Sequence, residues 1–132
     1  MIIVSACLLG EDCKYNGGNN YNKEVIEYLK DKDYVTICPE RVFGTPRKPV
    51  EIKNGRVINI DGEDVDKKYR EASEAEFEKI KNLQIDEAIL KAKSPTCGYS
   101  KIYNGNFEHK LVKGSGIFAE KLRNLDIPII EK

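Results

Sequence analysis

The sequence lacks an excess of either charge and lacks long apolar runs. Lys+Arg and Asp+Glu balance at 22 each, so net charge gives no reason to expect a nucleic acid or an anionic membrane as a partner. No apolar run approaches the roughly 20 residues that a membrane-spanning helix needs. Apolar residues make up 40% and charged residues 33%, which is typical of a globular protein and too apolar for a disordered one.

Several catalytic signatures are also missing. The single histidine, His109, follows an expected hairpin in a polar stretch. We interpret it as a surface residue, which argues against a histidine-based triad or a zinc protease. No G-x-G-x-x-G or P-loop lysine motif is present, which removes the usual nucleotide-binding signatures. No C-x2-4-C pair is present either, and structural zinc sites usually draw on such pairs.

What is present fits a single domain, residues 1–132, with one hydrophobic core. The start, MIIVSACLLG, lacks a basic segment and leads directly into a polar loop rich in Gly and Asn. We interpret it as the first buried strand of a cytoplasmic protein and not as a signal segment. The four cysteines are then more often ligands or catalytic thiols than disulfides.

Apolar segments alternate between strand-like and helix-like patterns along the chain. Buried strands are expected at 2–6, 34–38, 86–93 and 127–130, and helices at about 23–31, at about 64–83 and after 114–116. Asn22 is placed to cap the first helix. Asn54-Gly55 and Asn104-Gly105 each predict a tight β-hairpin, the second one between KIY and NFE.

Strands separated by helices imply right-handed crossovers and a parallel sheet covered on both faces. We therefore expect an α/β fold: a three-layer α/β sandwich with a small, mostly parallel, Rossmann-like sheet of about four strands and β-hairpin additions. In such sheets ligands bind beyond the carboxyl ends of the strands, near the switch in strand order.

Three cysteines lie at or just past the ends of three expected parallel strands. Cys7 follows the first, Cys38 ends the second, and Cys97 lies a few residues past the third. A lone cysteine beside a strand is often only a small buried apolar residue. Three thiols in the same relation to parallel strands favour a shared metal or cluster site instead. Dispersed thiolates suit a cubane iron–sulfur cluster that leaves one iron without a protein ligand. Such an open iron is a Lewis acid able to take a substrate atom, particularly sulfur.

Five other residues are candidates for the site. Glu40 is the preferred acid/base, unless it is a solvated loop carboxylate or a cap. Ser5 and Ser94 are candidate hydrogen-bond donors to cluster sulfurs or substrate, although Ser94 also fits the start of a turn. Arg47 suits binding of an anionic or carbonyl group, or a surface salt bridge. Ser115 fits an N-cap, at a helix start that is also able to bind an anion.

Short segments across the whole chain resemble a known bacterial family. They are SACLLG, KYNG, ICPE, TPRKPVEI, the G-x-D-V at 62–65, AILKAKSPTCG, IYNGNF and KGSGIFAEKL. In this order they resemble the domain of unknown function 523, which includes the 2-thiouracil desulfurases. The resemblance implies a [4Fe-4S] cluster held by Cys7, Cys38 and Cys97, with a free iron that abstracts sulfur from a small thiolated substrate. An exposed iron corner also implies sensitivity to oxygen.

The resemblance makes an iron–sulfur-dependent desulfidase the leading hypothesis. A non-catalytic cluster or metal protein (a sulfide carrier, sensor or structural module) is the alternative, and metal-free thiol chemistry at Cys7 or Cys97 is a third. Two features depart from the family pattern. Residues 41–44 are about two residues shorter than the usual Gly-rich segment, which would reshape the pocket. Cys13 is an extra thiol: a fourth ligand, a sulfur acceptor or, as we prefer, an incidental cysteine.

Overall fold

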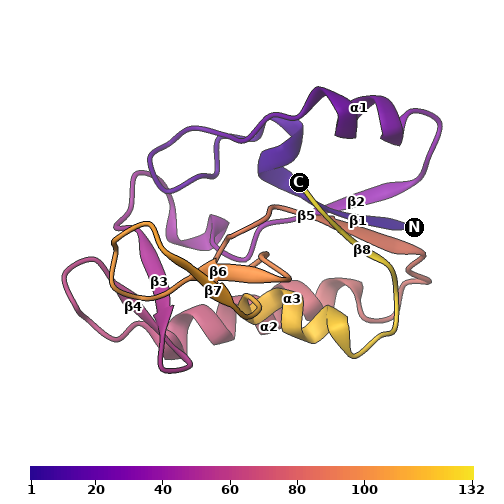
Figure 1. Ribbon diagram of the computed structural model, residues 1–132. Coiled ribbons are helices and arrows are strands. Elements are labelled where there is room, and N and C mark those ends of the chain that lie inside the picture. The colour runs from indigo at the N-terminus through magenta and orange to yellow at the C-terminus, as the bar shows by residue number, and fades with distance from the viewer.

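The core of the fold is a four-stranded parallel sheet. A computed structural model describes residues 1–132. It places β1 (Ile2–Ser5), β2 (Tyr34–Ile37), β5 (Glu87–Leu90) and β8 (Ile129–Glu131) in the order β2-β1-β5-β8 (Figure 1). Every neighbouring pair is parallel. The chain adds β2 on one side of β1 and β5 on the other, so the strand order switches at β1, where ligands bind in such sheets.

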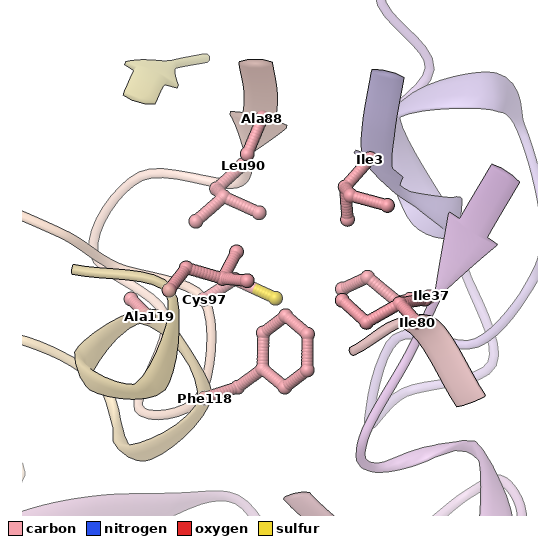
Figure 2. Close-up of a cluster of buried hydrophobic side chains, with 9 residues drawn as sticks. Ile3, Ile37, Ile80, Ala88, Leu90, Cys97, Phe118 and Ala119 are labelled. Carbon is pink, nitrogen blue, oxygen red and sulfur yellow. The ribbon is translucent and has the colours of Figure 1, made fainter. Parts of the chain in front are cut away.

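Helices cover both faces of this sheet. α1 (Lys23–Leu29) lies on one face, and α2 (Asp66–Ile80) and α3 (Ile117–Arg123) lie on the other (Figure 1). Successive strand residues point to opposite faces, which divides the core into two clusters. The α1 side contains Ile2, Val4, Leu8, Val25, Leu29 and Ile89; the α2 and α3 side contains Ile3, Ile37, Ile80, Ala88, Leu90, Cys97, Phe118, Ala119 and Leu122 (Figure 2). The predicted three-layer α/β sandwich is confirmed.

Two antiparallel hairpins form separate two-stranded sheets outside the parallel sheet. In the first, β3 (Val50–Lys53) pairs with β4 (Arg56–Asn59) through the predicted turn. Asn54 and Gly55 have positive φ angles of 51° and 77°, as a tight two-residue hairpin turn demands.

The second hairpin differs from the prediction. β6 (Lys101–Tyr103) pairs with β7 (Leu111–Lys113), not with the segment NFE, and residues 104–110 form a long loop between them. Gly105 has a positive φ of 92°, and a Cβ there would lie 2.4 Å from the Cβ of Lys53. Gly105 of the Asn-Gly pair therefore allows the loop backbone to approach β3 closely. The strand that pairs with β6 begins only at Leu111.

The helices are close to their predicted positions but shorter. The side chain of Asn22 accepts a hydrogen bond from the backbone N–H of Val25 at 3.2 Å, which confirms the predicted cap. α2 begins at Asp66 instead of 64, because Asp64 still bridges to Ile58 of β4. Two 3-10 turns complete the elements, η1 (Ala6–Leu9) and η2 (Arg41–Phe43). None of the helices combines the length and apolarity that crossing a membrane requires.

Candidate functional site

A pocket of about 630 Å³ opens where β1, β2 and β5 end. Its lining includes Ser5 at the end of β1, Cys7 just after β1, Cys38 after β2, and Cys97 in the turn beyond β5. Cys13 lines the same pocket, and all four cysteines are free thiols. The three cysteines singled out by sequence thus meet in one cavity, as the parallel arrangement of their strands predicts.

Cys7 lies in the 3-10 turn that follows β1. Its carbonyl oxygen accepts hydrogen bonds from the N–H groups of Gly10 at 3.2 Å and Asn20 at 3.0 Å, which fold the Gly/Asn-rich loop back over the turn. Burial raises the pKa of the Cys7 thiol, while a hydrogen bond from the Asn20 side chain opposes the rise.

Cys38 follows β2 directly, and its pKa is lowered, whereas that of Cys7 is raised. A hydrogen bond from the Cys13 thiol lowers the pKa of Cys38; burial opposes this, and the backbone N–H of Glu40 adds to it. Because a thiol must lose its proton to bind a metal, Cys38 is the cysteine best prepared to act as a ligand. The same pairing raises the pKa of Cys13, together with its burial.

Cys97 joins the pocket to the hydrophobic core. The residue is only 5% exposed, and Figure 2 shows it between Leu90 and Phe118 with its sulfur directed toward Ile37. Burial raises the pKa of its thiol, and a hydrogen bond from Ser5 opposes the rise. The role of Ser5 as a donor to cluster sulfurs or substrate stays a prediction. Its Oγ accepts the N–H of Lys91 at 3.0 Å, and the Thr96 hydroxyl donates to the Cys97 sulfur at 3.9 Å.

The turn that carries Cys97 is anchored on the start of α3. The N–H groups of Ile117 and Phe118 donate to the carbonyl oxygens of Pro95 and Thr96 at 3.0 and 2.9 Å. A Cβ on Gly116 would lie 2.5 Å from the backbone of Thr96. The first-turn N–H groups of α3 are therefore satisfied within the protein and hold the cysteine turn, so the expectation of an anion-binding helix start is wrong.

Ser115 does not have the predicted N-cap role. The N-cap residue is Gly116, and the Ser115 hydroxyl instead donates to the carbonyl oxygen of Tyr99 at 2.7 Å. It also accepts a hydrogen bond from Arg123. Ser115 is not among the residues that line the pocket. A contact between Ser115 and substrate therefore has no support in the geometry.

Gly116→Ala should disrupt this anchor. The added methyl group meets backbone atoms that cannot rotate away, so we expect a loss of about 2 kcal/mol or more of unfolding free energy and a weaker hold on anything bound by Cys97. Thermal unfolding and iron content after reconstitution measure the two effects. Gly114→Ala is the matched control, since its methyl group meets only the flexible end of Ile102, at 3.1 Å. Equal effects of both substitutions would contradict the anchor.

Glu40, Thr96 and Ser94 form a hydrogen-bonded chain along the pocket lining. The Thr96 hydroxyl donates to Glu40 Oε2 at 2.9 Å, and the Oγ atoms of Thr96 and Ser94 lie 3.1 Å apart. Ser94 Oγ also accepts the backbone N–H groups of Thr96 and Cys97, which leaves its own proton for the Thr96 oxygen. The two predicted catalytic residues are thus joined by Thr96, which sequence analysis missed although it lies within the quoted SPTCG segment.

The Glu40 carboxylate is enclosed, not solvated. Its side chain is 14% exposed, and Oε1 lies 3.7 Å from Arg47 Nη2. Burial raises the pKa of Glu40, while Arg47 and the Thr96 hydroxyl oppose the rise. A carboxyl group whose proton affinity is raised in this way, and which lines a pocket, suits proton transfer.

Arg47 is a structural link as well as part of the lining. Its Nη1 donates to the carbonyl oxygen of Gly44 at 2.8 Å and its Nη2 to that of Cys13 at 2.7 Å. The side chain is 10% exposed, so the surface salt bridge considered from sequence is wrong. Its Nε has no partner within the protein, and its role toward substrate stays a prediction.

The donor set fits an iron–sulfur cluster. Such clusters are held by cysteine thiolates, and three free thiols from segments far apart along the chain line one pocket here. Cys7, Cys38 and Cys97 would hold three corners of a cubane and leave its fourth iron without a protein ligand.

Other lining residues also escaped sequence analysis. His109, expected at the surface, is exposed but lines the pocket together with Tyr103 and Phe107. Cys13, interpreted as incidental, is 5% exposed and hydrogen-bonded to Cys38. The spacing of Cys13 from Cys7 offered no signal, because it depends on how the loop at 10–22 folds back.

The chain is similar to known proteins over its whole length. The sequence profile described as 2-thiouracil desulfurase matches residues 2–132. An uncharacterised protein of Bacillus subtilis (strain 168), YbbK, is 35% identical over 144 residues, covering 100% of this chain and 95% of its own. A solved structure of a [4Fe-4S]-dependent thiouracil desulfidase, TudS, superposes with a TM-score of 0.87 at 32% identity, covering 99% of this chain and 89% of that one. The chain therefore belongs to the 2-thiouracil desulfurase family.

Proposed function

We propose that this protein is a desulfidase that replaces the sulfur of a small thiolated heterocycle with oxygen from water, using a [4Fe-4S] cluster held by Cys7, Cys38 and Cys97. The observation that carries the proposal is the meeting of these three thiols in one pocket with the Glu40–Thr96–Ser94 chain. Family membership and the likeness to TudS support the reaction and the cofactor. A reducing compartment such as the cytoplasm suits four free thiols.

The cluster would supply an iron without a protein ligand, which acts as a Lewis acid toward the sulfur of the substrate. The net reaction converts a thiocarbonyl group and water into a carbonyl group and hydrogen sulfide, and requires no net transfer of electrons. The protein must therefore position the ring carbon, activate water and move protons.

Glu40 is the group we assign to proton transfer. It accepts the proton of the water that adds to the ring carbon, and this proton then leaves with the sulfide. Thr96 donates to Oε2 and holds that oxygen in place, while Arg47 lies on the side of Oε1. Ser94 completes the chain through the Thr96 hydroxyl, which positions the carboxylate.

Ser5 and Asn20 serve the thiolates. Each lowers the pKa of a cysteine thiol of the pocket, Ser5 that of Cys97 and Asn20 that of Cys7. Hydrogen bonds to cluster sulfurs are one of the means by which proteins set cluster properties. Cys13 lowers the pKa of Cys38 in the same way, which favours a supporting role for Cys13 over a purely incidental one.

Anaerobic reconstitution tests the proposal directly. We expect about four irons and four sulfides per chain, and release of sulfide and uracil in equal amounts from 2-thiouracil. The cluster-free protein is the control and should release neither. A loaded protein that releases no sulfide would support the non-catalytic cluster protein instead. Sulfide release without iron would favour metal-free thiol chemistry.

A further inference from the structure

The pocket has a second lining that the cluster ligands do not provide. Tyr103, at the end of β6, and Phe107 and His109, in the loop 104–110, all line the cavity. Tyr103 and Phe107 are half-buried and His109 is exposed. Three aromatic residues from one short segment thus line the same cavity as the cysteines.

This loop is held in place by β3. Glu51 Oε1 accepts the backbone N–H groups of Gly105 at 3.0 Å and Phe107 at 3.1 Å. Gly105 lies so close to β3 that its Cβ position is 2.7 Å from the carbonyl oxygen of Ile52. The loop also closes on itself through the Asn104 side-chain amide, which donates to Glu108 at 2.6 Å. The rings are therefore presented by a fixed backbone.

The backbone conformation of the loop is unfavourable for the residues that occupy it. Phe107 and His109 have positive φ angles of 52° and 60°, in the left-handed region that favours glycine and asparagine. Large side chains persist in such conformations where the surrounding structure imposes them, often at ligand clamps. A bulky aromatic residue at φ 52° breaks a local rule at the pocket, where such departures are expected to serve function.

The rings form a corner. The centroids of Tyr103 and His109 are 6.3 Å apart and their planes meet at 85°. A flat ligand is able to lie on the face of one ring and meet the edge of the other, both of which are favourable aromatic geometries. An open-chain thioamide offers no ring face for such contacts.

We propose that Tyr103, Phe107 and His109 form a stacking wall that selects flat heteroaromatic thiones over small open-chain ones. This inference rests on the proposed function, because it names the residues that would recognise the ring of that substrate in the same pocket. Glu51 is a positioning residue for the wall through its two backbone hydrogen bonds. The wall binds the ring of the substrate, and the reaction at its sulfur takes place on the side of the pocket lined by the cysteines.

Phe107 variants of the cluster-loaded protein test the wall. Uracil, which carries no sulfur and does not react, is titrated anaerobically by calorimetry. Stacking of a base on an aromatic side chain leads us to expect that Phe107→Ala weakens uracil binding by roughly ten-fold or more. Phe107→Leu, which keeps volume without a ring face, should weaken it similarly, and Phe107→Tyr should restore it. Asn106→Ala, on the same loop but outside the pocket lining, is the matched control.

A pair of substrates provides the second measurement. Phe107→Ala should lower kcat/KM for 2-thiouracil by about the same ten-fold factor and leave the rate with thiourea within about two-fold of the unmodified protein. Unchanged uracil binding, or equal losses with both substrates, would overturn the wall. If uracil binding depends on Phe107 but the loaded protein releases no sulfide, the wall stands and the proposed desulfidase function fails.

Discussion

Cys38→Ala should yield a protein that folds but retains almost no iron. Cys38 is the thiol with the lowered pKa among the four, and its removal takes away one of only three proposed ligands. We expect iron per chain to fall from about four to below one, and sulfide release from 2-thiouracil to fall to background. Iron and sulfide analysis after anaerobic reconstitution, with the visible absorbance of the cluster, measures the effect. Cys7→Ala and Cys97→Ala should behave alike.

Cys13→Ala is the matched control for this series. It removes a thiol of the same pocket that is hydrogen-bonded to Cys38, and it should leave the iron content near that of the unmodified protein. Thermal unfolding of the cluster-free variants shows whether each still folds, which matters most for the buried Cys97. The proposed ligand set is wrong if Cys38→Ala keeps its iron while Cys13→Ala loses it.

Glu40→Gln should separate catalysis from cluster binding. Glutamine keeps the volume of the side chain and an oxygen able to accept the Thr96 hydroxyl, but it cannot take up a proton. We expect kcat for 2-thiouracil to fall about 10²- to 10⁴-fold, the usual contribution of general acid–base catalysis, with iron content unchanged. Thr96→Val, which removes the hydroxyl that donates to Oε2 and contacts the Ser94 hydroxyl, should cause a smaller loss.

Glu11→Gln provides the comparison for Glu40. Glu11 is an exposed carboxylate paired with Arg41 at 2.6 Å, close in sequence to the cysteine loops but outside the pocket lining. Its substitution should leave both kcat and iron content within about two-fold. A normal kcat in Glu40→Gln would remove Glu40 from proton transfer, and a loss of iron would make its role structural.

The sequence alone was sufficient to predict which strands carry the cysteines of the site. The segments that end at Ser5, Ile37 and Leu90 are short, apolar and separated by helical patterns, and such strands align in parallel. Parallel strands end at one edge of a sheet, so the meeting of Cys7 and Cys38 followed from their positions one residue or two beyond a strand. Local pattern and topology agree there, which is why the prediction was confirmed.

Sequence was insufficient where a residue acts through a distant neighbour. The Asn-Gly pair at 104–105 predicts a tight turn, but the packing of Gly105 against Lys53 and Ile52 decides the path of the loop. His109 has a polar sequence context, yet the loop carries it to the pocket. No local sequence pattern predicts that the Glu51 carboxylate accepts hydrogen bonds from two backbone N–H groups of this loop.

The same distinction applies to the thiols themselves. The sequence by itself determined that three cysteines follow parallel strands, because the period of apolar residues and the strand–helix alternation are local properties of the chain. Only the tertiary structure decided that Cys13 pairs with Cys38, that Thr96 links Ser94 to Glu40, and that α3 anchors the Cys97 turn. These contacts join segments that are far apart along the chain and meet only when the loops pack together. Packing depends on the shape and burial of all the segments involved, so no single stretch of sequence predicts it.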